Sequence, residues 1–297
     1  MCGVVGLLLR DPDLESELGK LLVPMIAALD ERGPDSSGIA VYADRPGTTM
    51  QLSLGSDEVV DWLAFGESLS ASSVDQGSVE SFGAGLVVEI EPGHEAALKE
   101  FLATTWPQVR VLGTGSTLRV LKDTGRPHET CERYGIDQWQ GYMAVAHTRM
   151  ATESAVTVLH SHPFVPRQDL CVVHNGSFSN YATVRRRLQA DGVQFDSDND
   201  SEVAARFLAT RLEAGDDLDE ATRWVMKEMD GFFTMVITTA NEMSVVRDAF
   251  ACKPAVVAEM PGYIAVASEY RALAELPDIA KAEVFEPQPE EVYTWSR

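Results

Sequence analysis

The stretch MCGVVGLLLR, residues 1–10, sets a cysteine directly behind a methionine and in front of a run of apolar side chains. The run VVGLLL, rich in β-branched and aliphatic residues, is typical of a buried strand. Removal of Met1 would leave Cys2 with a thiol and a free α-amine on one residue. From this feature alone, Cys2 is either a catalytic nucleophile that carries its own base or a small buried residue at the start of a strand.

Composition limits the classes of partner. The chain has 297 residues, 45% of them hydrophobic, which suits one large domain or two small ones. It carries 24 Lys and Arg against 46 Asp and Glu, a formal net charge of −22 at pH 7. Such a charge repels nucleic acid and anionic membranes, so we expect neither as a partner. A basic partner protein is compatible with it.

The apolar runs are too short to span a bilayer, and the first one leads straight into the charged stretch DPDLESE. We therefore expect no membrane segment and no signal peptide, and a cytoplasmic protein. The four cysteines lie far apart and form no Cys-x-x-Cys pair, so we expect neither a disulfide framework nor a zinc site. His160 and His162 lie near Cys171 and His174, but strand alternation turns the last two to opposite faces, so we expect no metal there.

Strand-like runs outnumber helical ones, which predicts mainly antiparallel sheets with helices packed outside them. Helical patterns occupy 14–22, where we expect Pro24 to interrupt or restart the helix, and also 201–212 and 217–229. The segment from about 45 to 139 is too long for a plain loop. It contains its own strand and helix patterns, and we expect it to form a small inserted α/β subdomain within a single domain of residues 1–297.

Four further stretches decide between these two interpretations of Cys2. They are ERGPDSSGIA (31–40), AHTRMATES (146–154), CVVHNGSFSN (171–180) and DSDNDSEVAARFL (196–208). In this order behind MCG, they resemble the class II, N-terminal-nucleophile type of glutamine amidotransferase. The later runs GFFTMVITT, VVRDAFACKPA and VASEYRAL resemble the same family, so the likeness covers residues 1–42 and about 140–275. It implies an α+β fold, the αββα sandwich of N-terminal-nucleophile hydrolases.

The resemblance implies a glutaminase that hydrolyses glutamine to glutamate and ammonia through a thioester on Cys2. A free α-amine has a pKa of about 7.7–8.0, so part of it is neutral and able to take the thiol proton. The side-chain amide of Asn175 and the backbone N–H of Gly176 match the family's oxyanion hole. Arg32 matches the arginine that orients the N-terminal cysteine.

Three residues match the family's groups for binding free glutamine. Arg149 has a planar, permanently charged fork suited to the substrate α-carboxylate, and the hydroxyl of Thr152 could contact the same group. Asp200 matches the aspartate that holds the substrate ammonium, although a first-turn acid or N-cap is the commoner role of such a residue. One departure concerns the pocket. Glu153 and Ser154 follow HTRMAT, where many members have glycine, or histidine and then glycine.

Family members usually fuse the glutaminase to an acceptor domain, and no such domain is evident here. We therefore expect a separate synthase subunit that accepts the ammonia. Subunits of this kind are similar to those of split glutamate synthase-like systems, including the N-methylglutamate synthase type. We expect no cofactor in this chain, with FMN and iron–sulfur clusters in the partner subunits.

Two alternatives compete with an active glutaminase. The first is a non-catalytic structural or regulatory subunit that retains Met1, in which the α-amine lies on the wrong residue. The second is an N-terminal-nucleophile hydrolase that acts on another amide. The pairing of Arg149 with Asp200 argues against the second, because a clamp for a zwitterion has little use with a neutral acyl amide.

Overall fold

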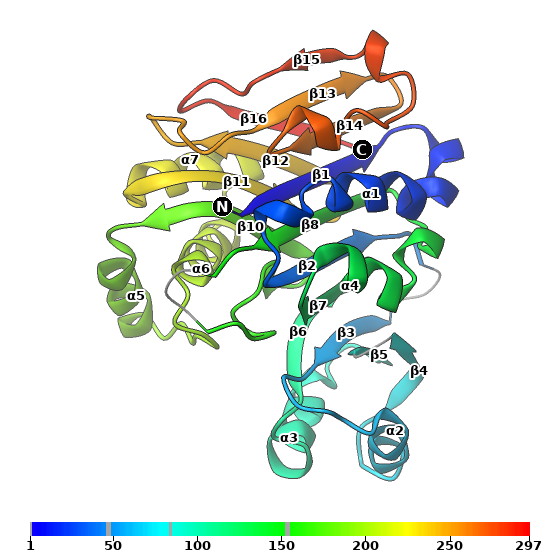
Figure 1. Ribbon diagram of the computed structural model, residues 1–297. Helices are drawn as coiled ribbons and strands as arrows, with labels where there is room; N and C mark the ends of the chain where they lie inside the picture. The colour runs from blue at the N-terminus through cyan, green and yellow to red at the C-terminus, as the bar shows by residue number, and fades with distance from the viewer. Residues whose placement is uncertain (1, 46–48, 83–84, 152–154) are drawn as a thin grey trace.

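The computed structural model describes residues 2–45, 49–82, 85–151 and 155–297. Two antiparallel sheets lie face to face, with helices on both outer faces (Figure 1). The predicted α+β sandwich is therefore confirmed. The seven-stranded sheet runs, from edge to edge, β15 (Glu283–Phe285), β13 (Val256–Met260), β14 (Tyr263–Ala267), β1 (Gly3–Leu9), β8 (Met143–Arg149), β2 (Ser36–Tyr42) and β7 (Leu118–Thr124). The five-stranded sheet runs β16 (Val292–Ser296), β12 (Glu242–Arg247), β11 (Gly231–Thr238), β10 (Leu170–Phe178) and β9 (Phe164–Arg167).

The strand β1 is buried on both faces, and its alternation supplies two cores. Its odd-numbered residues Val5 and Leu7 pack against the outer helices, whereas Val4 and Leu8 face the second sheet. Full burial of each such side chain contributes about 1.5–3 kcal/mol. The outer layers are formed by α1 (Leu18–Ala27) and α4 (Pro127–Tyr134) on one side, and by α5 (Tyr181–Ala190), α6 (Asp200–Glu213) and α7 (Leu218–Glu228) on the other.

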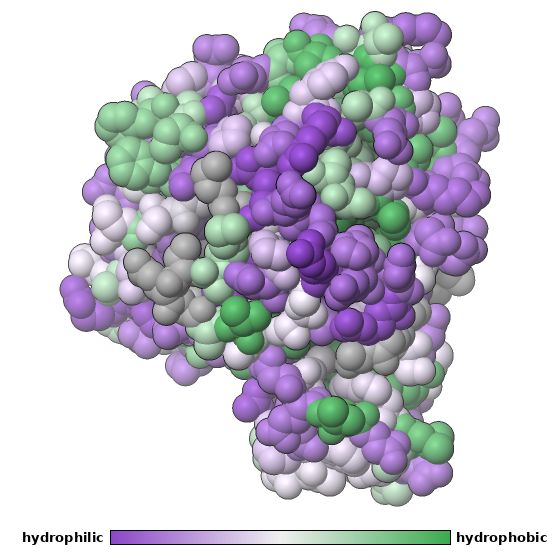
Figure 2. Space-filling view, viewed as in Figure 1, coloured by the Kyte–Doolittle hydropathy of each residue, from purple (hydrophilic) through white to green (hydrophobic). Residues whose placement is uncertain are grey.

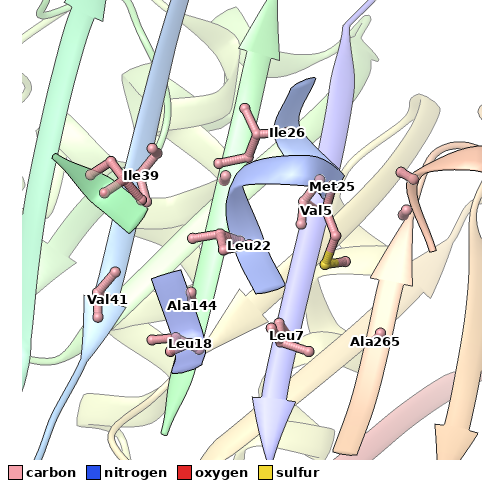
Figure 3. Packing of buried hydrophobic residues seen from close by; sticks show 14 of the residues in the cluster. Val5, Leu7, Leu18, Leu22, Met25, Ile26, Ile39, Val41, Ala144 and Ala265 are labelled. Carbon is pink, nitrogen blue, oxygen red and sulfur yellow. The ribbon is translucent and has the colours of Figure 1, made fainter. Parts of the chain in front are cut away.

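The helix α1 closes the first of these cores. Pro24 lies inside it, and the helix neither stops nor restarts there, so the predicted interruption or restart is wrong. The apolar face of the helix compensates for the backbone hydrogen bond that a proline cannot donate. Figure 3 shows this face over the seven-stranded sheet, with Leu18, Leu22, Met25 and Ile26 above Val5, Leu7, Ile39, Val41, Ala144 and Ala265.

Between β2 and β7 the chain leaves the main sheets and forms a separate four-stranded sheet below them (Figure 1). This unit spans residues 50–115, whereas β7 and α4 belong to the main body, so it is shorter than the expected 45–139. It has its own apolar core, formed by its sheet and two helices. Its elements are β3 (Met50–Gly55), α2 (Trp62–Ser70), β4 (Gln76–Phe82), β5 (Gly85–Ile90), α3 (Glu95–Thr105) and β6 (Arg110–Gly115).

Hydrophilic side chains cover most of the face seen in Figure 2, as the excess of acidic residues leads one to expect. No helix in the described part of the chain is long and apolar enough to cross a membrane.

The carboxylate of Asp169 fastens the turn through which the chain returns from the small sheet to β7. It accepts backbone N–H groups of Ser116, Thr117 and Leu118, each at 3.0 Å, and both hydroxyls of this turn. Burial alone would raise the pKa of Asp169, but these hydrogen bonds outweigh burial and lower it.

Replacement of Asp169 by asparagine should lower the free energy of unfolding by about 2 kcal/mol at neutral pH, because an amide presents only one acceptor oxygen to these donors. The folded-state pKa lies below the unfolded value, so this stabilisation exists above about pH 4 and disappears as the pH falls through the folded pKa. Urea denaturation of the unaltered protein and of Asp169→Asn at several pH values measures this contribution to the free energy of unfolding. The exposed Asp191→Asn is the control, and an equal loss in both variants would contradict the role of Asp169.

Candidate active site

Polar residues replace apolar ones at one end of the interface between the two sheets. Along β1, β8 and β10 the side chains that face this interface include Val4, Val145 and Val173. Since side chains alternate along a strand, the next residues on the same faces are Cys2, His147 with Arg149, and Asn175. Cys2, Arg149 and Asn175 line one cavity. In Figure 1, β1 begins close to β10. The apolar core thus ends in a polar site.

The backbone of Cys2 is held from two sides. Its carbonyl oxygen accepts a hydrogen bond from Arg32 Nε at 3.0 Å and another from Asn175 Nδ2 at 3.2 Å. The Sγ atom lies 3.8 Å from the carbonyl oxygen of Met150. Immediately beyond, Val4 N donates to Ser268 Oγ at 2.9 Å. Cys2 is therefore positioned through its main chain, and its thiol is only partly buried.

Arg32 is itself anchored by a carboxylate that the sequence reasoning missed. Its Nη1 lies 2.5 Å from Glu269 Oε1, and Arg271 Nε lies 2.6 Å from the other oxygen of Glu269. The hydrogen bond from Arg32 holds the pKa of Glu269 below its usual value. Glu269 belongs to the run VASEYRAL, which was noted in the sequence without a role for its acid. A buried arginine that requires a counter-charge is the signal that could have identified it.

Asn175 and Gly176 lie side by side on β10, where that strand pairs with β11. Gly176 has φ of +154°, and a Cβ added there would lie 2.0 Å from the backbone oxygen of Phe232. Only glycine fits this close approach of two strands. Asn175 is buried and already donates to Cys2, so the amide lies next to the nucleophile.

Arg149 ends β8 and is only 5% exposed. Its Nη1 donates to the carbonyl oxygen of Ala155 at 2.9 Å, and burial lowers its pKa. Asp35 fixes the backbone on either side, since its N–H donates to Arg149 O at 3.1 Å and its carboxylate accepts Ala151 N at 2.8 Å. Asp35 is thus a structural residue of this loop. Thr152, Glu153 and Ser154 lie outside the described residues.

Asp200 is the first residue of α6, and Asn199 provides the N-cap. One carboxylate oxygen of Asp200 accepts the backbone N–H of Phe178 at 2.8 Å, and the other accepts the hydroxyl of Ser201 at 3.2 Å. The bond from Phe178 joins the start of the helix to the end of β10. Asp200 therefore both begins the helix and lines the cavity beside Cys2.

Most of the residues chosen from the sequence line a single cavity of about 610 Å³. Its wall combines a thiol, a buried guanidinium, a carboxylate and paired amide donors, which suits a small zwitterion that carries an amide. In the part of the chain that the structure describes, no three His, Cys, Asp or Glu side chains are arranged to share a metal ion. The members of the set that line the cavity are Cys2, Arg149, Asn175, Gly176 and Asp200, and Arg32 lies behind Cys2.

Comparison with known proteins gives one consistent result. A family model described as a glutamine amidotransferase domain matches residues 147–275. The glutamine amidotransferase-like protein GlxB of Rhizobium meliloti (strain 1021) is 42% identical over 297 residues, which cover 99% of this chain and 98% of GlxB. A putative glutamine amidotransferase of Methanothermobacter thermautotrophicus is 31% identical, with 99% of each chain covered.

Among solved structures, the glutamine phosphoribosylpyrophosphate amidotransferase of B. subtilis is similar to this chain with a TM-score of 0.62. The alignment covers 100% of this chain and 49% of that one, at 18% sequence identity. At this identity the likeness establishes a shared fold.

Replacement of Gly176 by alanine should lower the free energy of unfolding by about 3 kcal/mol, because the new methyl group would collide with the backbone of β11. The matched control is Gly66→Ala in α2, where an added Cβ meets nothing within 4 Å. That change should instead stabilise the protein by up to about 1 kcal/mol through helix propensity. Chemical denaturation of both variants distinguishes the two cases, and similar stability of the two would contradict the close packing at Gly176.

Proposed function

This chain belongs to the class II, N-terminal-nucleophile type of glutamine amidotransferase, and on that premise we propose that it hydrolyses the side-chain amide of glutamine through a thioester on Cys2. The observation that carries the proposal is the single cavity in which the thiol of Cys2 meets Arg149, Asp200, Asn175 and Gly176. Each wall of this cavity offers the chemistry that one part of glutamine requires.

The first step requires a free α-amine on Cys2, which removal of Met1 would provide. The amine accepts the thiol proton, and the sulfur attacks the amide carbon of glutamine. Negative charge then develops on the amide oxygen, where the Gly176 N–H and the Asn175 side chain can donate to it. The C–N bond breaks as the amine returns its proton to nitrogen, and ammonia leaves. Water then cleaves the thioester to give glutamate and restores the thiol.

Substrate binding would use the two charged walls of the cavity. Arg149, buried at the end of β8, presents its guanidinium to the α-carboxylate of glutamine. Asp200 presents its carboxylate to the α-ammonium. Because both charges are partly shielded from water, each interaction is stronger than it would be at the surface. The clamp also selects free glutamine over an amide inside a peptide, which lacks the zwitterion.

The role proposed for Arg32 is to orient the nucleophile. Its Nε holds the carbonyl oxygen of Cys2, while Glu269 holds the other side of the guanidinium. A chain terminus frays unless it is tied down. The pair of Arg32 and Glu269 would therefore keep the thiol aligned toward Gly176 when Cys2 becomes the first residue.

We further propose that the ammonia passes to a separate synthase subunit, of the glutamate synthase-like or N-methylglutamate synthase type. FMN and iron–sulfur clusters would then belong to the partner subunits. The net charge of −22 favours a partner with a basic docking surface.

The competing function is a non-catalytic subunit of such a complex with a retained Met1. It predicts the same fold and the same family, but no release of glutamate from glutamine. A coupled assay for glutamate with the purified chain separates the two functions.

Arg149→Lys tests the substrate clamp in that assay. One ammonium cannot reproduce the bidentate contact of a guanidinium, so the KM for glutamine should rise about 10- to 100-fold with a smaller change in kcat. Arg223→Lys is the matched control, because Arg223 lies exposed on α7 and pairs only with Asp219 among the described residues. An unchanged KM in a correctly folded Arg149→Lys protein would overturn the role of Arg149.

A further inference from the structure

The two charged walls of the glutamine clamp come from separate segments of the chain. Arg149 ends β8, whereas Asp200 begins α6. Glutamine carries its α-carboxylate and its α-ammonium on a single carbon atom, so the two walls must stand at one short, fixed separation. A displacement of about 1 Å is enough to weaken such a contact severely. The bonds that tie the two segments together therefore decide which ligand fits.

The segment 155–162 is attached to the first of these walls. The carbonyl oxygen of Ala155 accepts a hydrogen bond from Arg149 Nη1 at 2.9 Å. The segment then turns back on itself, since Ser161 Oγ lies 2.7 Å from the carbonyl oxygen of Thr157. It is therefore a compact turn that begins at the guanidinium of the clamp.

Two other parts of the molecule hold this turn in place. Ser161 Oγ lies 2.9 Å from Ser36 Oγ of β2, and both serines are buried. From the small subdomain, Asp57 Oδ1 accepts the backbone N–H of Val158 at 2.5 Å. Because the turn is fixed by the main sheet and by the subdomain, it can support a further element of the site.

Asn199 connects the turn to the second wall of the clamp, and it lines the same cavity. As the N-cap of α6, its Oδ1 accepts the backbone N–H of Ser201 at 2.9 Å. Its Nδ2 donates to the carbonyl oxygen of His160 at 3.2 Å. One bond requires the oxygen of the amide and the other requires its nitrogen, so a single orientation satisfies both. The side chain thus joins the turn to the start of α6, one residue before Asp200.

The imidazole of His160 makes a second contact between the same two elements. Its Nδ1 lies 2.7 Å from Thr157 Oγ1, and its Nε2 lies 2.7 Å from Asp198 Oδ1. The side chain of Asp198 is 81% exposed, and a contact so open to water adds little. The bond from Asn199 is partly buried and is therefore the main connection.

We propose that Asn199 is a positioning residue that sets the separation between Arg149 and Asp200. It thereby selects a ligand whose ammonium and carboxylate share one carbon atom. The proposal rests on the glutaminase function proposed above and adds a determinant of substrate choice to the same site. Asn199 acts through the position of Asp200, because its bridge keeps the start of α6 from shifting relative to β8.

Calorimetric titration of the Cys2→Ala chain tests this separation without turnover, because a chain that lacks the thiol can bind glutamine but cannot form the thioester. The two ligands are glutamine and β-homoglutamine, in which an added methylene separates the carboxylate from the carbon that bears the ammonium. The ratio of their Kd values measures how strictly the clamp keeps its separation. Partial unfolding lowers the fraction of competent protein but leaves this ratio unchanged.

Asn199→Ser removes the bridge and keeps the helix cap. Serine is also a good N-cap and can still accept the N–H of Ser201, but its side chain is too short to reach the carbonyl oxygen of His160. In the Cys2→Ala chain this change should raise the Kd for glutamine about ten-fold, the effect of one lost hydrogen bond. The preference for glutamine over β-homoglutamine should fall from about 50-fold to about 5-fold, because α6 can then adjust to the longer ligand.

Asn180→Ser in the same background is the matched control. Asn180 also uses both ends of its amide, since Nδ2 donates to Glu228 O at 2.8 Å and Oδ1 accepts Asp230 N at 3.0 Å. Within the described part of the chain, it lies outside the lining of the cavity. The control should leave both Kd values unchanged.

Asn199→Asp is a second variant, for the case in which Asn199→Ser does not fold. It keeps the size of the side chain and the cap, but it sets a carboxylate oxygen against the carbonyl oxygen of His160 in place of a donor. The added charge attracts the ammonium of both ligands, so the ratio of Kd values still reports the bridge. This ratio should fall as it does in Asn199→Ser.

Two results would overturn the role of Asn199. One is the same ratio of Kd values in the Asn199 variant and in Asn180→Ser, and the other is a Cys2→Ala chain that binds both ligands equally well. The proposed hydrolysis fails in a different way. If Cys2→Ala binds glutamine but the unaltered chain forms no glutamate, the glutaminase function is refuted and the role of Asn199 stands, whereas a chain that does not bind glutamine refutes both.

Discussion

The arrangement of the site depends on two hydrogen bonds to one carbonyl oxygen, that of Cys2. Arg32, just ahead of β2, and Asn175, on β10, both donate to it. Without them Cys2, the residue ahead of β1, would lie in a frayed chain end. A thiol in a frayed end would not be held in line with the groups that bind the substrate. Both donors are themselves held, Arg32 by Glu269 and Asn175 by the pairing of β10 with β11. The contacts within the sandwich thus fix the position of Cys2 at the end of the chain.

A second constraint is the change from apolar to polar side chains at the end of the inter-sheet core. The same faces that carry Val145 and Val173 carry His147 and Asn175 two residues later. Strand alternation makes this possible, and the pairing of β1 with β8 and of β10 with β11 stays in register there. Polar groups are concentrated where the sheets meet the cavity, and the hydrogen bond that Asp200 accepts from Phe178 of β10 brings α6 to the same place. The same hydrogen bonds therefore stabilise the fold and position the residues of the site.

Much of this could be predicted from the sequence. Alternation and composition were sufficient for mainly antiparallel sheets with outer helices, and the order of motifs behind MCG pointed to the family. Arg149, Asn175, Gly176 and Asp200 were selected by these motifs, and they line one cavity. Their individual roles in catalysis remain proposals that rest on this geometry.

Other features could not be predicted because they arise from contacts between distant segments. Glu269 lies more than two hundred residues from Arg32 in the sequence, and no local pattern predicts that the two side chains form an ion pair. The buried residues His147, His162 and His174 come from three separate stretches, and no local pattern predicts that their rings lie close together. The return of β7 to the main sheet depends on Asp169, fifty residues away. Pro24 fits in α1 because tertiary packing outweighs its local cost.

The central claim is that Cys2 is an armed nucleophile specific for glutamine. The most direct measurement is the intact mass of the purified chain before and after exposure to 6-diazo-5-oxo-norleucine, a glutamine mimic that alkylates a reactive thiol. We predict a chain without Met1 that gains a single adduct, mapped to Cys2 by peptide analysis and absent from Cys2→Ala. A chain that retains Met1 and gains no adduct would contradict the claim and favour a non-catalytic subunit.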